Sequence, residues 1–186
     1  MAGLPDPTAR LSPDDRAALE RLTAVRTRAS GRRTPAQVYV RMFNNPGVAR
    51  AVSGLGEHLR FHGVLPDRER ELAILRFAAR TGVGYEWAHH QGLAERAGVD
   101  AATMAALAEP GVPAGLDDPA RAVVEAVDAT VDGRPIPPGV QERLAGVAGL
   151  AGVVEVVALC GLYRLMGDMV TAFEIGIEEG LPEPPF

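Results

Sequence analysis

Helix-start and helix-stop signals divide the chain into short, regularly spaced segments, and this pattern constrains the fold more than any other feature. Start signals stand at Ser12, Thr34 and Pro66, and stop signals stand at Gly31, Gly63 and Gly98. The β-branched cluster 153–157 shows no period-two alternation, so no strand is expected. The sequence therefore predicts an all-α helical bundle, with helices over roughly 12–29, 34–43, 48–61, 67–80, 85–97, 100–108, 118–131, 138–147 and 151–177.

The length of 186 residues fits a single domain that can bury a full core. We expect residues 1–11 to form a disordered N-terminal tail, 12–180 to form one all-α domain, and 181–186 to form a proline-rich C-terminal tail. The segment 110–116 is the only internal linker candidate, and it is too short to separate two domains.

Charge and hydropathy exclude several classes of protein. A formal net charge of −5 argues against the basic face that nucleic-acid binding needs, and the single cysteine, Cys160, excludes an intrachain disulfide. Residues 1–10 lack the apolar run of a signal peptide. The most apolar stretch, 145–163, contains Glu155 and several glycines, which indicates a core or interface helix and not a membrane span. These patterns predict a cytoplasmic protein that binds neither nucleic acid nor membrane.

Glu71 is a carboxylate on the apolar side of a predicted helix. It shares one face with Ile74, Leu75 and Ala78, whereas Glu69, Arg76 and Arg80 form a separate polar stripe. Burial disfavours the charged carboxylate and raises its pKa unless a cation pairs with it. The pattern fits a catalytic carboxyl group and, equally well, a structural ion pair with an arginine.

Glu86 and His90 lie one helical turn apart on the next helix, on an otherwise apolar stripe. Imidazole titrates near neutral pH and a carboxylate orients it, so the pair suits proton transfer. Such a pair taken alone is more often structural than catalytic. The tight turn 81–84 joins the two helices, and we therefore expect Glu71, Glu86 and His90 to converge in one site.

These residues lie in segments that resemble the carboxymuconolactone decarboxylase family. The matching segments are Leu65-Pro66, Glu71–Arg76, Tyr85–His90, Ala94, Ala97-Gly98 and Gly161–Arg164. The resemblance covers roughly residues 38–182. Within the family, the chain is similar to the branch whose signature reads YEW, two residues, then H. It implies the alkylhydroperoxidase D-like helical bundle and a homo-oligomer, a dimer, trimer or hexamer, with sites near subunit contacts.

Some proteins of this fold carry a redox CxxC motif. On that pattern Val83 and Glu86 stand where the two cysteines would be, His90 takes the histidine position, and Glu71 takes the upstream glutamate. Without a thiolate no dithiol peroxidase cycle can run, and Cys160 has no cysteine partner. Peroxidase activity is thus expected to be lost, and proton transfer remains the chemistry that these residues support.

Metal binding is the weaker alternative for the same region. Glu86-x-x-His89 has the spacing used in carboxylate-bridged di-iron bundles, but a second motif of this kind is absent. His58 and His62 stand one turn apart and lack a third ligand at local spacing. We expect neither a metal nor a cofactor.

The resemblance implies a cofactor-independent lyase that acts on a small lactone or keto acid. A protonated His90 would deliver a proton to carbon, with Glu71 or Glu86 setting its tautomer and charge. The candidate substrate-binding residues are Tyr85, Trp87 and His89, and the candidates for holding a substrate carboxylate are Arg41 and Arg50. Two alternatives remain open: an isomerase, dehydratase or cyclase acting on a natural-product intermediate, and a non-catalytic oligomeric binding protein.

Overall fold

The computed structural model describes residues 3–30 and 35–186, and those residues contain helices and no strand. After a short 3-10 helix at Thr8–Arg10, the helices are α1 (Pro13–Ser30), α2 (Gln37–Met42), α3 (Pro46–Phe61), α4 (Asp67–Thr81), α5 (Gly84–Arg96), α6 (Ala101–Ala108), α7 (Asp118–Val131) and α8 (Pro138–Ala172). The predicted all-α bundle is confirmed. The predicted stop at Gly31 and start at Thr34 lie outside the described residues.

Short polar side chains begin several helices where the sequence predicts a start. The Asn45 side chain accepts a hydrogen bond from the Val48 amide at the beginning of α3, and Asp100 and Asp117 cap α6 and α7 in the same way. Gly82 ends α4 with φ 68° and ψ 20°, a left-handed conformation that glycine adopts without a Cβ penalty. The chain therefore turns within two residues and enters α5.

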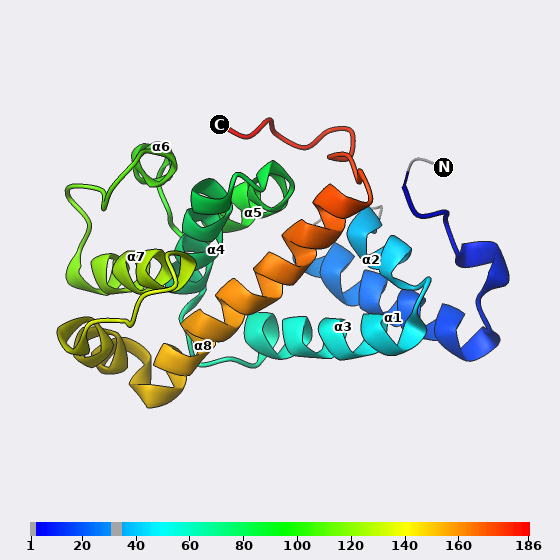
Figure 1. The fold of residues 1–186 in the computed structure, drawn as a ribbon, viewed down its shortest axis with the longest axis horizontal. Coiled ribbons are helices and arrows are strands. Elements are labelled where there is room, and N and C mark those ends of the chain that lie inside the picture. Colours follow the sequence, from blue (N-terminus) through cyan, green and yellow to red (C-terminus); the bar gives the residue numbers. More distant parts are fainter. Residues whose placement is uncertain (1–2, 31–34) are drawn as a thin grey trace.

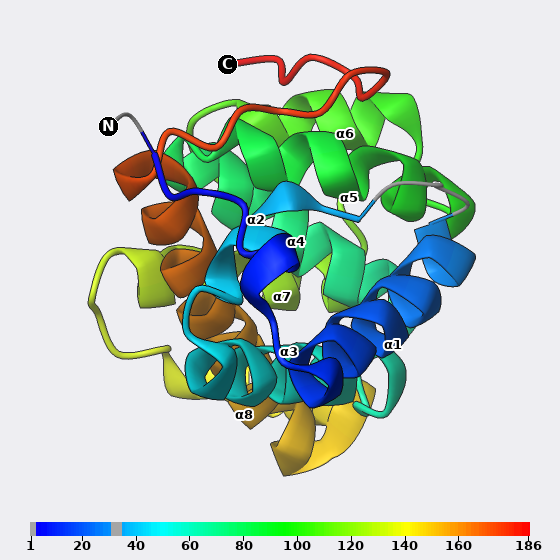
Figure 2. The ribbon, with the colours of Figure 1, turned by 90° about the vertical axis from the view of Figure 1, so that its right-hand side faces the viewer.

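Helix α4 lies at the centre of the bundle. It packs against α5, α6, α7 and α8, and its apolar side chains are almost fully buried. Helix α8 runs obliquely between the group α4–α7 and the group α1–α3, and it contacts members of both (Figures 1 and 2). Side chains of α5 and α8 therefore meet beside the central helix.

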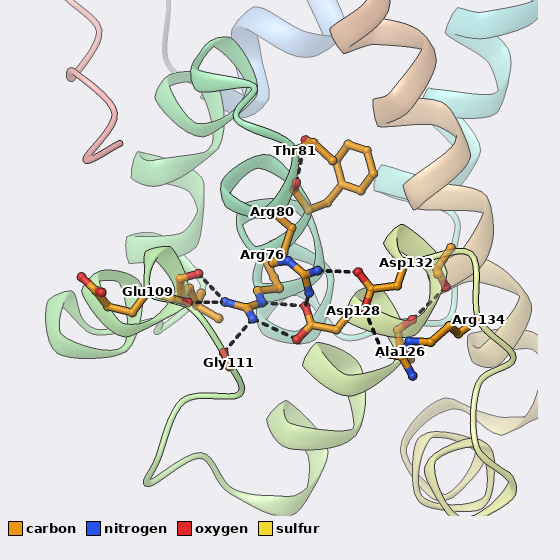
Figure 3. Close-up of polar contacts among 12 residues, drawn as sticks. Arg76, Arg80, Thr81, Glu109, Gly111, Ala126, Asp128, Asp132 and Arg134 are labelled. Carbon is orange, nitrogen blue, oxygen red and sulfur yellow. Dashed lines mark hydrogen bonds and ion pairs between the residues drawn. The ribbon is translucent and has the colours of Figure 1, made fainter.

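The predicted polar stripe of α4 is also largely buried, which the hydrophobic pattern did not indicate. Arg76 is fully buried, and its Nε and Nη2 donate to the two carboxylate oxygens of Asp128 on α7 at 2.8 and 2.9 Å (Figure 3). Its remaining N–H groups donate to the carbonyl oxygens of Leu107, Glu109 and Gly111. One arginine thus joins α4 to α7 and to the loop that precedes it.

The two helices predicted over 138–147 and 151–177 are joined in α8 across a break at Ala148 and Gly149. The helix ends at Ala172, five residues earlier than predicted, because the chain turns back there. Within the described ranges α8 is the one helix long and apolar enough to cross a membrane on those two criteria. This is weak evidence, since core helices of soluble proteins meet the same criteria.

The described parts of the terminal segments, predicted as tails over 1–11 and 181–186, make contacts with the bundle. The side chains of Asn44 and Arg10 are hydrogen-bonded, and Asn44 also donates to the carbonyl oxygen of Pro5. At the other end, Phe186 packs edge-on against Trp87 of α5. Prolines and single apolar residues can bury surface in this way without any helical periodicity, so the sequence pattern carried no signal for it.

Candidate functional site

Glu71, His90 and Tyr163 form a continuous chain of hydrogen bonds between three helices. The Nδ1 atom of His90 lies 2.7 Å from Oε2 of Glu71, and the hydroxyl of Tyr163 lies 3.0 Å from Nε2 of His90. An ionised carboxylate only accepts hydrogen bonds, so Nδ1 carries a proton and the neutral ring accepts at Nε2 from the Tyr163 hydroxyl. All three side chains are buried.

Close packing of α8 on the α4–α5 turn places Tyr163 against His90. A Cβ atom at Gly167 would lie 2.8 Å from a methyl carbon of Val83, so only glycine allows this approach. Tyr163 lies one helical turn before Gly167, and its ring meets His90 edge-on with centroids 5.2 Å apart. Tyr163 was not among the predicted site residues, because its partner lies far away in the sequence.

Charge within the Glu71–His90 pair is set by burial and by the neighbouring arginines. Burial alone raises the pKa of Glu71, but His90, Arg60 and Arg70 outweigh it and hold that pKa below its usual range. Burial lowers the pKa of His90, and the Glu71 carboxylate opposes this. Glu71 is therefore the ionised member, and the resting ring is neutral.

Glu86 is buried, with 3% of its surface exposed, and its Oε1 atom has no hydrogen-bond partner among the described residues. Burial is the main reason that the pKa of Glu86 rises to about 8, and Arg60 opposes the rise. The group is therefore mostly a neutral carboxylic acid at neutral pH. Glu71, and not Glu86, is hydrogen-bonded to His90 and sets its tautomer.

A pocket lies between α1, α2, α3, α5 and α8 and is lined by Glu86, His90 and Tyr163. Its cavity volume is about 60 Å³, several times the roughly 10–15 Å³ that one water molecule requires. Arg26, Tyr39, Arg60, Leu93 and Met166 form further parts of its wall. Glu86 and His90 thus border a space that can admit a small molecule, and Glu71 is connected to it through its hydrogen bond to His90.

Two of the three predicted substrate-binding residues, Tyr85 and His89, line this pocket. Both contact the carboxylate of Glu178, whose Oε1 accepts from the Tyr85 hydroxyl and whose Oε2 lies 2.7 Å from Nε2 of His89. Trp87 does not line the pocket. Its Nε1 donates to Gln91, and its ring packs on Phe186.

The arginines proposed from the sequence to hold a substrate carboxylate lie elsewhere. Arg50 pairs with Asp15, and Arg41 lines a different pocket near the N-terminal segment, so neither reaches Glu86 or His90. Arg60, the second-last residue of α3, lines the pocket instead. In the part of the chain that the structure describes, no group of three or more His, Cys, Asp or Glu side chains is arranged to hold a metal ion.

Comparison with known proteins shows the fold and finds a family match over part of the chain. Residues 46–129 match the carboxymuconolactone decarboxylase family, a range that contains Glu71, Glu86 and His90 but not Tyr163. Two crystal structures of the debrominase Bmp8, one without ligand and one of an alanine variant in complex with 2,3,4-tribromopyrrole, superpose with TM-scores of 0.72 and 0.73. Each is 18% identical and covers 91% of this chain and 90% of its own, so the likeness shows the fold alone. No curated protein sequence matches the chain.

Proposed function

Because residues 46–129 match the carboxymuconolactone decarboxylase family, we propose that the protein is a cofactor-independent carboxy-lyase that moves a proton to a carbon atom of a small lactone or keto acid. The observation that carries this proposal is the hydrogen-bonded series Glu71–His90–Tyr163, which ends at a pocket shared with the neutral Glu86. We place the enzyme in the cytoplasm.

In the proposed reaction, the bond between the substrate and its carboxyl group breaks. The electron pair stays on the substrate as an enolate, and carbon dioxide leaves. Tyr163 then donates its hydroxyl proton to carbon and is left as a phenolate. The neutral His90 ring takes up a proton from water at Nε2 and passes it to the phenol oxygen, and the Glu71 carboxylate stabilises the transient imidazolium. Each turnover therefore takes up one proton.

Positioned proton transfer of this kind typically accelerates a reaction by roughly 10²–10⁴-fold. Glu86 supports it as a neutral hydrogen-bond donor for the enolate oxygen, since it faces the same pocket and retains its proton at neutral pH. Thiol chemistry has less support. The single cysteine, Cys160, does not line the pocket, and burial raises the pKa of its thiol to about 12.

The cavity beside His90 argues against a non-catalytic scaffold, which would fill this space with a closed hydrogen-bond cluster. An isomerase, dehydratase or cyclase would use the same residues. Mass spectrometry of the product distinguishes these reactions, because only decarboxylation removes the mass of carbon dioxide.

The test is a carbon-dioxide-release screen over lactone and keto acids with three variants. His90→Ala should abolish turnover, and Tyr163→Phe should reduce it by roughly 10²-fold or more. The control His58→Ala, at an exposed histidine outside the pocket, should retain full activity. Circular dichroism should show that each variant remains helical. Full turnover by a folded His90→Ala protein would overturn the mechanism.

A further inference from the structure

Arg60 is a partly buried arginine whose guanidinium is not hydrogen-bonded to any carboxylate among the described residues. Among the residues that the structure describes, its guanidinium makes no hydrogen bond or ion pair, and its Nε is buried without a partner. The guanidinium carbon lies over the ring of Phe61, 5.2 Å from the centroid. A guanidinium in this state lacks the carboxylate that such groups usually bind in protein interiors.

The surroundings of Arg60 explain where a counter-ion can come from. The side chain lines the pocket of Glu86, His90 and Tyr163, and it also borders a second pocket that holds Arg70 and Arg96. Glu71 attracts the Arg60 charge, but its carboxylate is hydrogen-bonded to His90. Glu86 lines the same pocket, and burial keeps it mostly neutral. The N–H groups of Arg60 are therefore left to bind a carboxylate that a ligand brings.

Glu86 offers the complementary half of the site. Its carboxyl group is almost fully buried, its Oε1 has no partner within the described residues, and it lines the pocket with Arg60. A carboxylic acid that keeps its proton donates one strong hydrogen bond to an acceptor that brings no charge, such as a carbonyl oxygen.

We propose that the pocket recognises an organic acid at two points, with Arg60 binding a carboxylate and Glu86 donating a hydrogen bond to an oxo or lactone carbonyl of the same molecule. This inference rests on the proposed function and assigns the specificity of that site. Arg60 and Glu86 bind the substrate and set its specificity, whereas His90 and Tyr163 transfer the proton. An ion pair stabilises the carboxylate that it holds, so the carboxylate on Arg60 is one that the product keeps.

The experiment measures binding by isothermal titration calorimetry, without turnover. The probes are levulinate, which has both groups, methyl levulinate, which lacks the charge, and pentanoate, which lacks the carbonyl. Levulinate should bind roughly 10-fold or more tightly than either analogue, because each analogue loses one charge-assisted or buried hydrogen bond.

The variants assign the two contacts separately. Arg60→Gln should lower the affinity for levulinate by roughly 10–100-fold while leaving the affinity for methyl levulinate nearly unchanged. Glu86→Leu should weaken the binding of levulinate until its affinity equals that of pentanoate. Glu86→Gln keeps an N–H donor and should retain most of the wild-type affinity for levulinate. The control is Arg96→Gln, an exposed arginine that borders only the second pocket, and it should bind like the wild type.

The outcomes separate this inference from the proposed function. If binding depends on Arg60 but the protein turns over no acid, the inference is supported and the proposed lyase function is rejected. Turnover with unchanged levulinate affinity in folded Arg60→Gln would overturn the inference and leave the lyase intact. Equal binding of the acid and its ester, or no binding of any probe, would also overturn it.

Discussion

At the residue scale, Glu86 couples the pocket to the stability of the fold. Its pKa is about 8 in the folded protein, against 4.5 for an unperturbed glutamate, chiefly because the carboxyl group is buried. As the pH rises above about 4.5, the unfolded chain loses this proton first and the folded chain keeps it. The free energy of unfolding should therefore fall from about pH 4.5 to about pH 8, where the loss is complete.

Glu86→Gln removes this titration, because an amide does not ionise. Relative to the wild type, the variant should gain stability across that window, by a few kcal/mol at most, since one pKa unit corresponds to about 1.4 kcal/mol. Urea unfolding of both proteins at about pH 5 and about pH 8 provides the measurement. A constant difference between the two proteins at both values would contradict the assignment of Glu86 as a buried neutral acid.

At the scale of helices and segments, one buried ion pair joins α4 to α7. Arg76 is fully buried and Asp128 is its carboxylate partner, so Asp128→Asn leaves the guanidinium charge without its counter-ion. Breaking a buried pair in this way typically costs about 3–5 kcal/mol. Chemical denaturation should show a loss of that size. Asp132→Asn, one turn later on an exposed pair with Arg80, is the matched control and should change stability little. Similar losses in both variants would show that burial is not the cause.

The C-terminal segment 173–186 is held on α5 by the Glu178 carboxylate. Besides Tyr85 and His89, this carboxylate accepts a hydrogen bond from the backbone amide of Gln37, and such contacts lower the pKa of Glu178 to about 2 although burial opposes them. The segment therefore ties α5 to the start of α2 at the edge of the pocket.

Glu178→Ala should release this segment while most of the bundle stays folded, because the affected contacts lie at the chain end. Amide hydrogen exchange should rise in residues 173–186 and at Gln37. The neighbouring exposed Glu179 provides the control variant Glu179→Ala, which should exchange like the wild type. Unchanged exchange in Glu178→Ala would mean that apolar contacts such as Phe186 on Trp87 suffice to hold the segment.

At the scale of the whole molecule, α8 leaves an apolar face uncovered. Leu150 and Val154 are 78% and 68% exposed, and Val157 continues the same stripe one turn later. Exposed apolar stripes of this kind commonly mark contacts between subunits. We therefore propose that the protein is a homo-oligomer that uses this face.

Val154→Asp places a charge in the middle of that face and should shift the protein to a smaller species in size-exclusion chromatography with light scattering. Glu142→Gln, at an exposed polar position on the same helix, should leave the assembly unchanged. A wild-type protein that is monomeric at micromolar concentration, or an unchanged Val154→Asp oligomer, would exclude this face as the interface.

The sequence by itself determined the helices and the placement of Glu71, Glu86 and His90, because both follow from local periodicity and from capping and breaking residues. The sequence predicts separate helices over 138–147 and 151–177, and the structure has a break at Ala148 and Gly149 between the two parts of α8. Local patterns also showed that these three side chains belong to apolar helix faces, where burial perturbs their pKa values.

Only the tertiary structure decided which groups complete the site. Tyr163, Arg60 and Glu178 reach the pocket region from α8, α3 and the C-terminal segment, through contacts between distant parts of the chain. Their neighbours in the sequence give no indication of those contacts. The apolar pattern of a helix predicts which face is buried, but it does not predict which helix packs against that face. The same limit applies to the arginine that holds a substrate carboxylate. The sequence shows the charge of Arg41, Arg50 and Arg60 but not their distances from the pocket, and of these three only Arg60 lines it.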